Sequence, residues 1–330
     1  MVSRRKFVHD MAVAGTAGAL GMSRNLFAAE PPPEIRKLRL VRQPFDIACI
    51  SPLWVAEDML RAEGFEDIQY VPTTTSAATL AAGGLDFMIG DIFGALPIMD
   101  AGKPLVVLSG IHSGCYELFG VGNVRGVRDL KGKTIAVANP GRRAFVGLMV
   151  SHVGLDPNKD VTFVEAPGPK GVEMLSEGKV DALLSFSAES YEIKARKIGR
   201  SLVNTLTDKP WSQYLCCVAA SNRNFITRYP VATKRVLRAL LKAAAVCAAE
   251  PAQSARLLVD RGFLRDYAAA EQVLRDLPYK RWREFDPADS LRFFALRLHE
   301  AGFIKSNPQK LLAQGTDWRF VDALKREMKG

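Results

Sequence analysis

The sequence predicts an α/β protein of two lobes, each with a central, mostly parallel sheet flanked by helices. Strand-like and helix-like segments alternate from residue 37 to about residue 250, and such alternation is typical of parallel sheets whose crossovers are helices. A pattern also occurs twice. TLAAGGLDFMIGD at 79–91 and MLSEGKVDALLSF at 174–186 both place Leu and Gly before an apolar strand that contains Asp. With 330 residues the chain is long enough for two such lobes.

The first lobe begins with KLRLVRQ at 37–43, where apolar and polar residues alternate as they do in a strand. A loop and a helix follow and end at Gly64, which is a typical helix terminator. Further strands are predicted at 65–72, 85–91 and 104–111, with helices at 76–84 and 92–102. Helices between consecutive strands predict parallel pairing.

The second lobe repeats this order. Strands are predicted within 129–141 and at 161–167, 180–186 and 214–221, with helices at 142–154 and 169–179. A long helix is predicted at 228–251, and the segment from there to residue 330 is mostly helical.

Composition limits the classes of function. The formal net charge of +10 favours anionic partners in general. Nucleic acid is not predicted as a partner, because the chain has no basic helix with interleaved aromatics, no zinc-finger spacing and no RNA-binding signature.

The N-terminal segment, residues 1–29, has the layout of a secretory signal: a basic start, an Ala/Gly-rich middle and a small-residue end. Arg4 and Arg5, framed by Ser3 and Phe7, resemble a twin-arginine signal, which directs the export of folded proteins. An ordinary basic start for general secretion is the alternative. Cleavage is expected near Ala28 or Ala29, and the mature protein is then periplasmic.

The five cysteines are odd in number and scattered in the sequence, so they predict no disulfide framework. We interpret them as small buried apolar residues. Neither Cys nor His stands at ligand spacing around them, so no metal site is predicted, and no cofactor motif is present. The five are Cys49, Cys115, Cys216, Cys217 and Cys247.

Four segments together resemble a known family. They are TLAAGGLDFMIGD at 79–91, DLKGKTIAVANPG at 129–141, AESYEIKARKIG at 188–199 and ASNRNFITRYPVATKRVLRALLKA at 220–243. In this order they are similar to the periplasmic solute-binding proteins of ABC importers, of the nitrate, sulfonate and taurine type, a group that includes binders of thiamine-precursor pyrimidines. Two positions depart from the family pattern: Ala188 stands where Trp is usual, and Ser190 where Pro is usual.

The resemblance implies a periplasmic-binding-protein type II-like fold with two hinge segments. Lobe 1 would comprise 37–120 and 222–330, and lobe 2 would comprise 121–221. A ligand would lie between the lobes, beyond the carboxyl ends of the strands. The protein would be a monomer that works with an ABC permease in the inner membrane, after export by the twin-arginine translocase.

Hydroxyl side chains mark one candidate ligand-binding position. Thr74, Thr75 and Ser76 lie where the strand at 65–72 ends and a helix begins. Hydroxyls there can cap free N–H groups, and the same N–H groups attract an anion. One hydroxyl is enough for a cap, so we expect some of the three to face the cleft.

The matching position in the second lobe is NPGRRAFVG, where Arg142 and Arg143 stand at a helix start. A positive charge at a helix N-terminus is unfavourable because it opposes the helix dipole. This cost favours a ligand role for one of the arginines, such as a two-pronged bond to a carboxylate or sulfonate. Solvated arginines at a lobe rim are the alternative. Glu189 matches the family's Glu and could accept from a ligand amine or form a hinge salt bridge. Further candidates at strand ends are Phe45, Ser51, Pro52, Asp91, Ser113 and Tyr214.

The sequence thus predicts a binding protein, and not an enzyme, that captures a small anionic organic solute such as a sulfonate or carboxylate. Alternatives are a pyrimidine-precursor binder, an enzyme like the thiamine pyrimidine synthases, and a sensor that reports to a membrane receptor. Those synthases carry a Cys-Cys-Cys-Phe-Cys motif, whereas this chain has only the pair Cys216-Cys217. A hydrolase is not predicted, because no Gly-x-Ser-x-Gly elbow is present.

Overall fold

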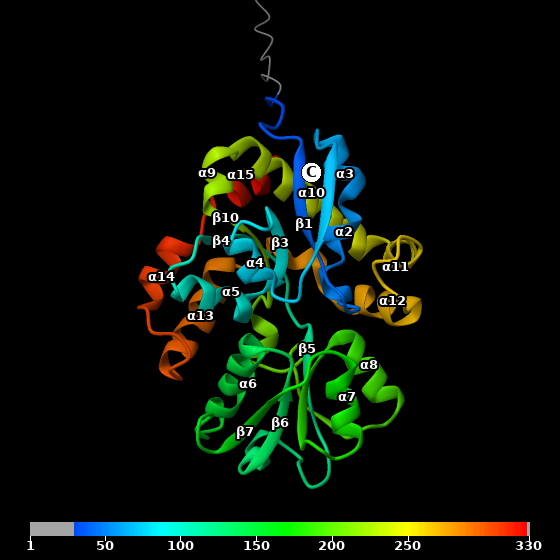
Figure 1. Ribbon diagram of the computed structural model, residues 1–330, viewed down its shortest axis with the longest axis vertical. Coiled ribbons are helices and arrows are strands. Elements are labelled where there is room, and N and C mark those ends of the chain that lie inside the picture. The colour runs from blue at the N-terminus through cyan, green and yellow to red at the C-terminus, as the bar shows by residue number, and fades with distance from the viewer. Residues whose placement is uncertain (1–29, 329–330) are drawn as a thin grey trace, which may run out of the picture. The chain divides into compact units, whose positions relative to one another are not determined.

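The computed structural model describes residues 30–328, so the predicted signal peptide at 1–29 lies outside the described residues. Residues 33–328 form one compact unit that contains two five-stranded sheets. The predicted two-lobed α/β class is confirmed, and Figure 1 shows one sheet in each lobe.

The first sheet has the strand order β2-β1-β3-β10-β4. β1 pairs in parallel with β2 and β3, whereas β10 pairs antiparallel with β3 and β4. The sheet is therefore mixed. Its strands are β1 (Lys37–Arg42), β2 (Asp67–Pro72), β3 (Phe87–Asp91), β4 (Leu105–His112) and β10 (Cys217–Asn222).

The second sheet has the matching order β7-β6-β8-β5-β9, again with two parallel and two antiparallel pairings. Sequence analysis misses β5 and β9. All five residues of β5 are buried, so its sequence YELFG shows no clear alternation. The strands are β5 (Tyr116–Gly120), β6 (Lys133–Val137), β7 (Val161–Glu165), β8 (Ala182–Phe186) and β9 (Arg200–Asn204).

The chain crosses between the sheets twice. It leaves the first sheet after β4 and enters the second at β5, so the first crossing is the short segment 113–115. It returns through 205–216 to β10. Residues 116–120 therefore pair within the second sheet, and residues 217–221 within the first, although the sequence analysis assigns them the other way round.

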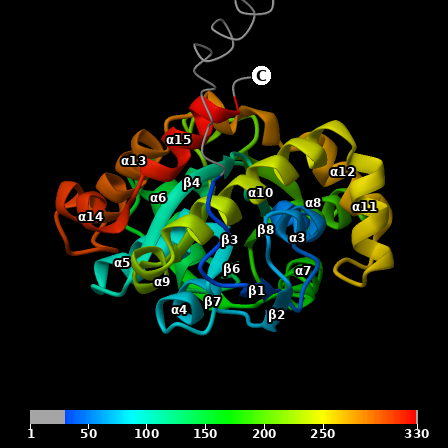
Figure 2. The same ribbon diagram turned by 90° about the horizontal axis from the view of Figure 1, so that it is seen from above.

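Helices cover the first sheet, and the long α10 lies across it (Figure 2). α10 begins at Pro230, whose missing N–H costs nothing at a first helical position. The segments of this lobe are η1 (Ala48–Ile50), α2 (Pro52–Val55), α3 (Glu57–Ala62), α4 (Ser76–Ala81), α5 (Ile92–Asp100), α9 (Arg223–Arg228), α10 (Pro230–Ala249), α11 (Pro251–Asp260), α12 (Tyr267–Asp276), η4 (Tyr279–Arg283), α13 (Pro287–Glu300), α14 (Pro308–Gly315) and α15 (Arg319–Glu327).

The second lobe carries η2 (Val127–Leu130), α6 (Pro140–His152), α7 (Pro169–Ser176) and α8 (Ser187–Ala195), and η3 (Trp211–Gln213) lies on the return crossing. Among the described residues, no helix is both long and apolar enough to cross a membrane.

Aromatic rings join the two lobes. Phe93 of α5 stacks on Phe145 of α6, with ring centroids 3.7 Å apart, and both rings contact Phe294 of α13. Tyr116 of β5 packs edge-on against Phe93 and Phe145. The N-terminal ends of α5 and α6 are therefore held together, and this contact defines one side of the site described next.

Candidate ligand-binding cleft

A cavity of about 690 Å³ is lined by residues of both lobes. From the first lobe it is reached by the segment after β1, the start of α4 and the start of α5. From the second lobe it is reached by the starts of α6 and α7 and by the β8–α8 junction. Apart from the segment after β1, these are places where a strand gives way to a helix. Ligands of open α/β sheets bind at such strand ends.

Arg142 is the most unusual side chain of the cavity. Asn139 is the N-cap of α6, and its side-chain Oδ1 accepts a hydrogen bond from the Arg142 backbone N at 3.1 Å. The Arg142 side chain is only 5% exposed, and its guanidinium lies 3.2 Å from the centroid of the Phe186 ring. Its Nε has no hydrogen-bond partner among the described residues. A buried cation at a helix N-terminus with an unpaired donor is costly in the empty protein.

Asp91 lines the same cavity and is close enough to Arg142 for their charges to interact. It is the N-cap of α5, where it accepts from the Gly94 backbone N at 2.5 Å, and it also accepts from the Tyr116 hydroxyl at 3.0 Å. Burial raises the pKa of Asp91 above its ordinary value, and the charge of Arg142 only partly offsets this. The Tyr116 contact joins a strand of the second sheet to a helix start of the first lobe.

Glu189 is the second carboxylate near Arg142. It lies in the first turn of α8 and accepts from the Phe186 backbone N at 3.0 Å, so it caps its own helix. Burial raises its pKa, and Arg142 again acts in the opposite direction. Among the described residues neither carboxylate hydrogen-bonds to the guanidinium, so the charge of Arg142 receives only longer-range compensation.

The hydroxyl stretch lines the cavity with Thr74, Thr75 and Ser76. The capping expectation is wrong for this helix: Thr75 is the N-cap of α4, but its side chain makes no cap hydrogen bond. Instead Thr73 Oγ1 accepts from the Thr75 backbone N at 3.1 Å, and Gln43 Nε2 donates to Ser76 Oγ at 2.6 Å.

Apolar side chains make up much of the remaining wall. Phe45 meets the second lobe directly, because its ring lies 3.0 Å from the position that a Cβ would take on Gly168 at the start of α7. Gly168 has φ 61°, a conformation that favours glycine. The other large apolar lining residues are Ile47, Ile50, Met88, Ile89, Phe93, Pro97, Ile98, Phe186 and Phe303.

The structure brings eight of the twelve predicted site residues to this cavity: Phe45, Thr74, Thr75, Ser76, Asp91, Arg142, Arg143 and Glu189. Arg143 is exposed there, and its guanidinium lies over Phe163 at 5.3 Å.

Four predicted site residues do not line the cavity and have structural partners. Ser51 Oγ donates to the Ala48 carbonyl at 2.6 Å, and Pro52 opens α2. The Ser113 carbonyl contacts the His112 ring, and Tyr214 stacks on Phe293 at 3.9 Å. Ser113 and Tyr214 lie on the crossing segments beside β4 and β10, whereas Ser51 and Pro52 lie well beyond the end of β1, at the start of α2.

Sequence reasoning missed several lining residues, among them Gln43, Tyr116, Asn139 and Phe186. Phe186 is the last residue of β8, and Asn139 is a helix cap, so a search of every strand-to-helix junction would have found both. Tyr116 gives no such signal, because β5 runs antiparallel to β8 and its first residue lies where β8 ends.

Four of the five cysteines lie close together in space, with a histidine, although their spacing in the sequence predicts no metal site. Cys49, His112, Cys115 and Cys217 are all buried, and one ligand atom from each lies within 4.8 Å of the others. Cys49 and Cys217 also line the cavity. None of the five cysteines is in a disulfide.

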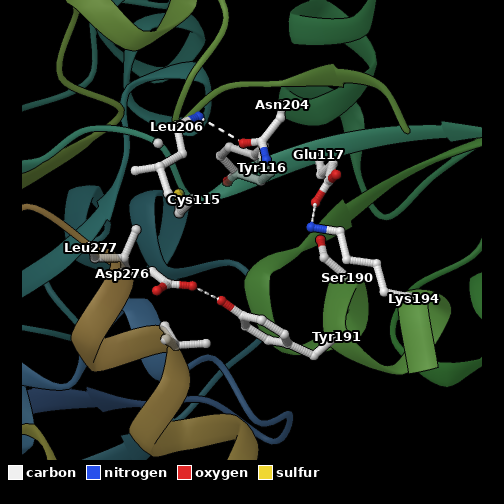
Figure 3. A pocket seen from close by; sticks show the side chains of 12 residues that line it. Cys115, Tyr116, Glu117, Ser190, Tyr191, Lys194, Asn204, Leu206, Asp276 and Leu277 are labelled. Atoms are coloured by element: carbon white, nitrogen blue, oxygen red, sulfur yellow. Dashed lines mark hydrogen bonds and ion pairs between the residues drawn. The ribbon is translucent and has the colours of Figure 1, made fainter. Parts of the chain in front are cut away.

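A second, smaller cavity of about 60 Å³ lies between α8, α12 and the crossing segments (Figure 3). Lys194 pairs there with Glu117 at 2.7 Å, and the Tyr191 hydroxyl donates to the Asp276 carboxylate (Figure 3). The latter bond joins α8 of the second lobe to α12 of the first. Cys115 lines this cavity too.

A family model described as NMT1/THI5 like matches residues 68–254. The chain belongs to this family. The match spans both lobes and covers most of the residues that line the large cavity, including Asp91, Arg142 and Glu189. No curated protein matches the sequence.

Solved structures of periplasmic binding proteins share the fold. The alkanesulfonate-binding protein SsuA from Xanthomonas axonopodis pv. citri, bound to MOPS, superposes with a TM-score of 0.69 at 20% identity, over 88% of this chain and 100% of that one. The nitrate-binding protein NrtA from Synechocystis PCC 6803 gives 0.72 at 11% identity, over 91% and 90%. The aliphatic sulphonate-binding protein SsuA from Escherichia coli gives 0.65 at 16% identity, over 85% and 92%.

Proposed function

We propose that this protein is an exported solute-binding protein that closes on an organic anion with an apolar or aromatic body and delivers it to an ABC importer. The observation that carries the proposal is Arg142: a buried guanidinium with an unpaired Nε at the wall of a large, mainly apolar cavity. The ligand would bind by its acid group to Arg142 and by its body to the surrounding rings.

The acid group follows from the charge of the site. A carboxylate or sulfonate bonded to Arg142 would pair the free donor and neutralise the cation in a medium where both effects are large. The N-terminus of α6 adds a positive partial charge at the same place.

The apolar body follows from the size and lining of the cavity. Ligand sites for organic molecules have volumes of roughly 300–1,000 Å³ and mostly apolar walls with a few polar groups. This cavity of about 690 Å³ lies within that range. An inorganic ion such as nitrate would leave most of it unfilled, so nitrate is a poorer fit than an organic sulfonate or carboxylate.

Transport is the role that the fold neighbours suggest. These neighbours are an alkanesulfonate-binding protein and two periplasmic proteins, one that binds nitrate and one that binds aliphatic sulphonates. We extend this role to the present chain, as a periplasmic monomer that works with an inner-membrane permease and is exported by the twin-arginine route. A binding role without catalysis agrees with the residues of the cleft, because Asp91 and Glu189 are both held by helix caps.

A ligand that also carries an amino group is the second candidate. Two half-buried carboxylates, Asp91 and Glu189, lie near Arg142, and partial desolvation raises the pKa of each. Either could accept hydrogen bonds from an amine, as an aminopyrimidine or an amino acid would offer. The aromatic rings of Phe93 and Phe186 would suit a flat heterocycle.

Thermal unfolding of the mature protein against a solute panel tests both candidates. The panel would hold alkyl and aryl sulfonates, aliphatic and aromatic carboxylates, nitrate and aminopyrimidines. A ligand at 100 times its dissociation constant adds about 2.7 kcal/mol to the free energy of unfolding. We expect the largest rise in melting temperature with aryl sulfonates or aromatic carboxylates.

Neighbouring arginines supply a matched pair of variants. Arg142→Gln should lower the affinity for the best anion at least tenfold, because a charge-assisted bond is lost, whereas Arg143→Gln should change it less than threefold, because Arg143 is exposed. A response to neutral or cationic aminopyrimidines alone, unaffected by Arg142→Gln, would refute the anion proposal and support the second candidate.

A further inference from the structure

The buried cluster of cysteines and histidine lies beneath the floor of the cleft. Its members come from four separate segments: Cys49 from η1, His112 from the end of β4, Cys115 from the first crossing, and Cys217 from the start of β10. All four side chains are buried, and one ligand atom of each lies within 4.8 Å of the others.

We propose that Cys49, His112, Cys115 and Cys217 form a tetrahedral site for a thiophilic cation, Zn²⁺, that holds the two crossing segments together. Three thiolates and one imidazole are a donor set typical of structural zinc. The proposal does not depend on which solute the cleft binds.

The spacing of the sulfurs suits tetrahedral coordination. Zinc–sulfur bonds are about 2.3 Å long, so two sulfurs of one tetrahedral ion lie about 3.8 Å apart. The Sγ atoms of Cys115 and Cys217 are 3.7 Å apart. The Sγ atom of Cys216 lies only 3.1 Å from that of Cys115, which is too close for two ligands of one zinc ion. Cys217 is therefore the ligand from this pair, and Cys216 lies outside the set.

The histidine ring supplies a second, independent observation. Nε2 of His112 lies 3.0 Å from the Cys49 carbonyl, and Nδ1 lies 3.1 Å from the Ser113 carbonyl. A neutral imidazole has one N–H, so it can donate to only one of these oxygens and turns a lone pair towards the other. Metal-binding histidines donate the second ring N–H to a carbonyl or carboxylate. The Nε2–H bond to the Cys49 carbonyl would fill that role, and Nδ1 would exchange its contact with the Ser113 carbonyl for the ion.

The ion would have a route to the site. Cys49 and Cys217 line the large cavity, and Cys115 lines the small cavity on the other side (Figure 3). Three of the four ligands can therefore be reached without unfolding of the lobes.

A bound ion would restrict the hinge. Cys115 lies on the first crossing, and Cys217 directly follows the second, so one ion would tie both segments to η1 of the first lobe. Lobe motion would then take place about a fixed pivot. If the chain is exported folded, as proposed above, an ion captured before export would travel with it.

Metal binding by the purified, reduced mature protein tests the proposal. The metal-free protein is titrated with Co²⁺ and then with Zn²⁺, under a phosphine reductant that does not bind the ions. We expect one ion per chain by elemental analysis. Co²⁺ should give the thiolate charge-transfer band and the intense visible bands of tetrahedral coordination, which Zn²⁺ should abolish by displacement.

Five variants separate this site from its surroundings. Cys115→Ser, Cys217→Ser and His112→Gln should each weaken Zn²⁺ binding at least tenfold, the usual scale for loss of a strong metal contact. Cys216→Ser, next to the site, and Cys247→Ser, a buried cysteine of α10 far along the chain, should leave one tightly bound ion. Circular dichroism confirms that each variant is folded, and three ligand variants keep the test decisive if one of them does not fold.

Three outcomes would overturn the proposal. The first is no tight Zn²⁺ binding by the reduced wild-type protein. The second is equal Zn²⁺ binding by Cys217→Ser and the wild type. The third is a Cys115–Cys216 disulfide, found by mass spectrometry of the protein purified without reductant, whose reduction gives no metal uptake. That third result would assign the cluster to a covalent link between the crossing segments instead.

Discussion

Gly141 offers a direct test of whether closure of the lobes is needed for binding. It is the second residue of α6, and a Cβ added there would lie 3.0 Å from the Phe93 carbonyl oxygen and 3.1 Å from the backbone N and Cα of Gly94. All three contacts are with backbone at the start of α5, in the other lobe. A side chain at position 141 can therefore be accommodated only if the lobes move apart.

The size of the effect follows from this contact. Val adds the Cβ and two methyl groups, and overpacking of this kind costs about 1–3 kcal/mol. The cost falls on the closed arrangement alone, because α6 itself tolerates Val at this position without left-handed backbone. Since about 1.4 kcal/mol corresponds to a tenfold change in equilibrium constant, Gly141→Val should weaken solute binding about 5- to 150-fold.

The assay is isothermal titration with the best solute from the panel, together with denaturant unfolding of the free protein. Gly126→Val is the control, because a Cβ on Gly126 meets no atom within 4 Å and its φ is −158°. The control should bind as the wild type does. Wild-type affinity in Gly141→Val, with the variant folded, would refute the view that the solute is bound between closed lobes with α5 and α6 in contact.

Two further predictions concern stability. Phe145→Ala should lower the free energy of unfolding by about 3–5 kcal/mol, measured in urea, because Phe145 is 1% exposed and stacks on Phe93; a loss below 1 kcal/mol would contradict this. Asp91→Asn should stabilise the free protein at pH 7. Burial raises the pKa of Asp91 in the folded state above its ordinary 3.8, so the folded state holds the proton more tightly than the unfolded state does. Asp91 therefore lowers the free energy of unfolding as pH rises from 3.8 through the raised pKa of the folded state. The gain should vanish at pH 3, and thermal unfolding at both pH values checks it.

Sequence periodicity predicts the strands and helices that lie on the parallel half of each sheet. Strands 67–72 and 182–186 each follow a helix-terminating glycine. The first alternates between exposed and half-buried residues over most of its length and the second is a buried run, so local residues specify both. β5 and β9 escape prediction because their partners lie far along the chain, whereas their length is the same as that of predicted strands such as β6 and β8. β5 pairs with β8 and β9, and β9 pairs with β5 alone, and local propensity does not encode such pairing.

The candidate site divides in the same way. Asp91, Arg142 and Glu189 each lie where a strand is followed by the start of a helix. This local sequence pattern is sufficient to select them. Strand-end position alone also selects Ser113 and Tyr214, which do not line the cavity. A strand end tells where a side chain starts, but the packing of neighbouring elements decides whether it turns to the cleft or to the core.

The sequence by itself determined the two-lobed α/β class, the family and the arginine at the start of α6, because repeats, helix signals and motifs are local properties of the chain. Only the tertiary structure decided that Arg142 is buried with an unpaired donor, and that Cys49, His112, Cys115 and Cys217 meet in space. These residues span 49 to 217 in the chain, and their proximity arises from two crossings between sheets. Contacts that arise from such crossings cannot be predicted from local sequence spacing, because the residues that meet are separated by long stretches of chain.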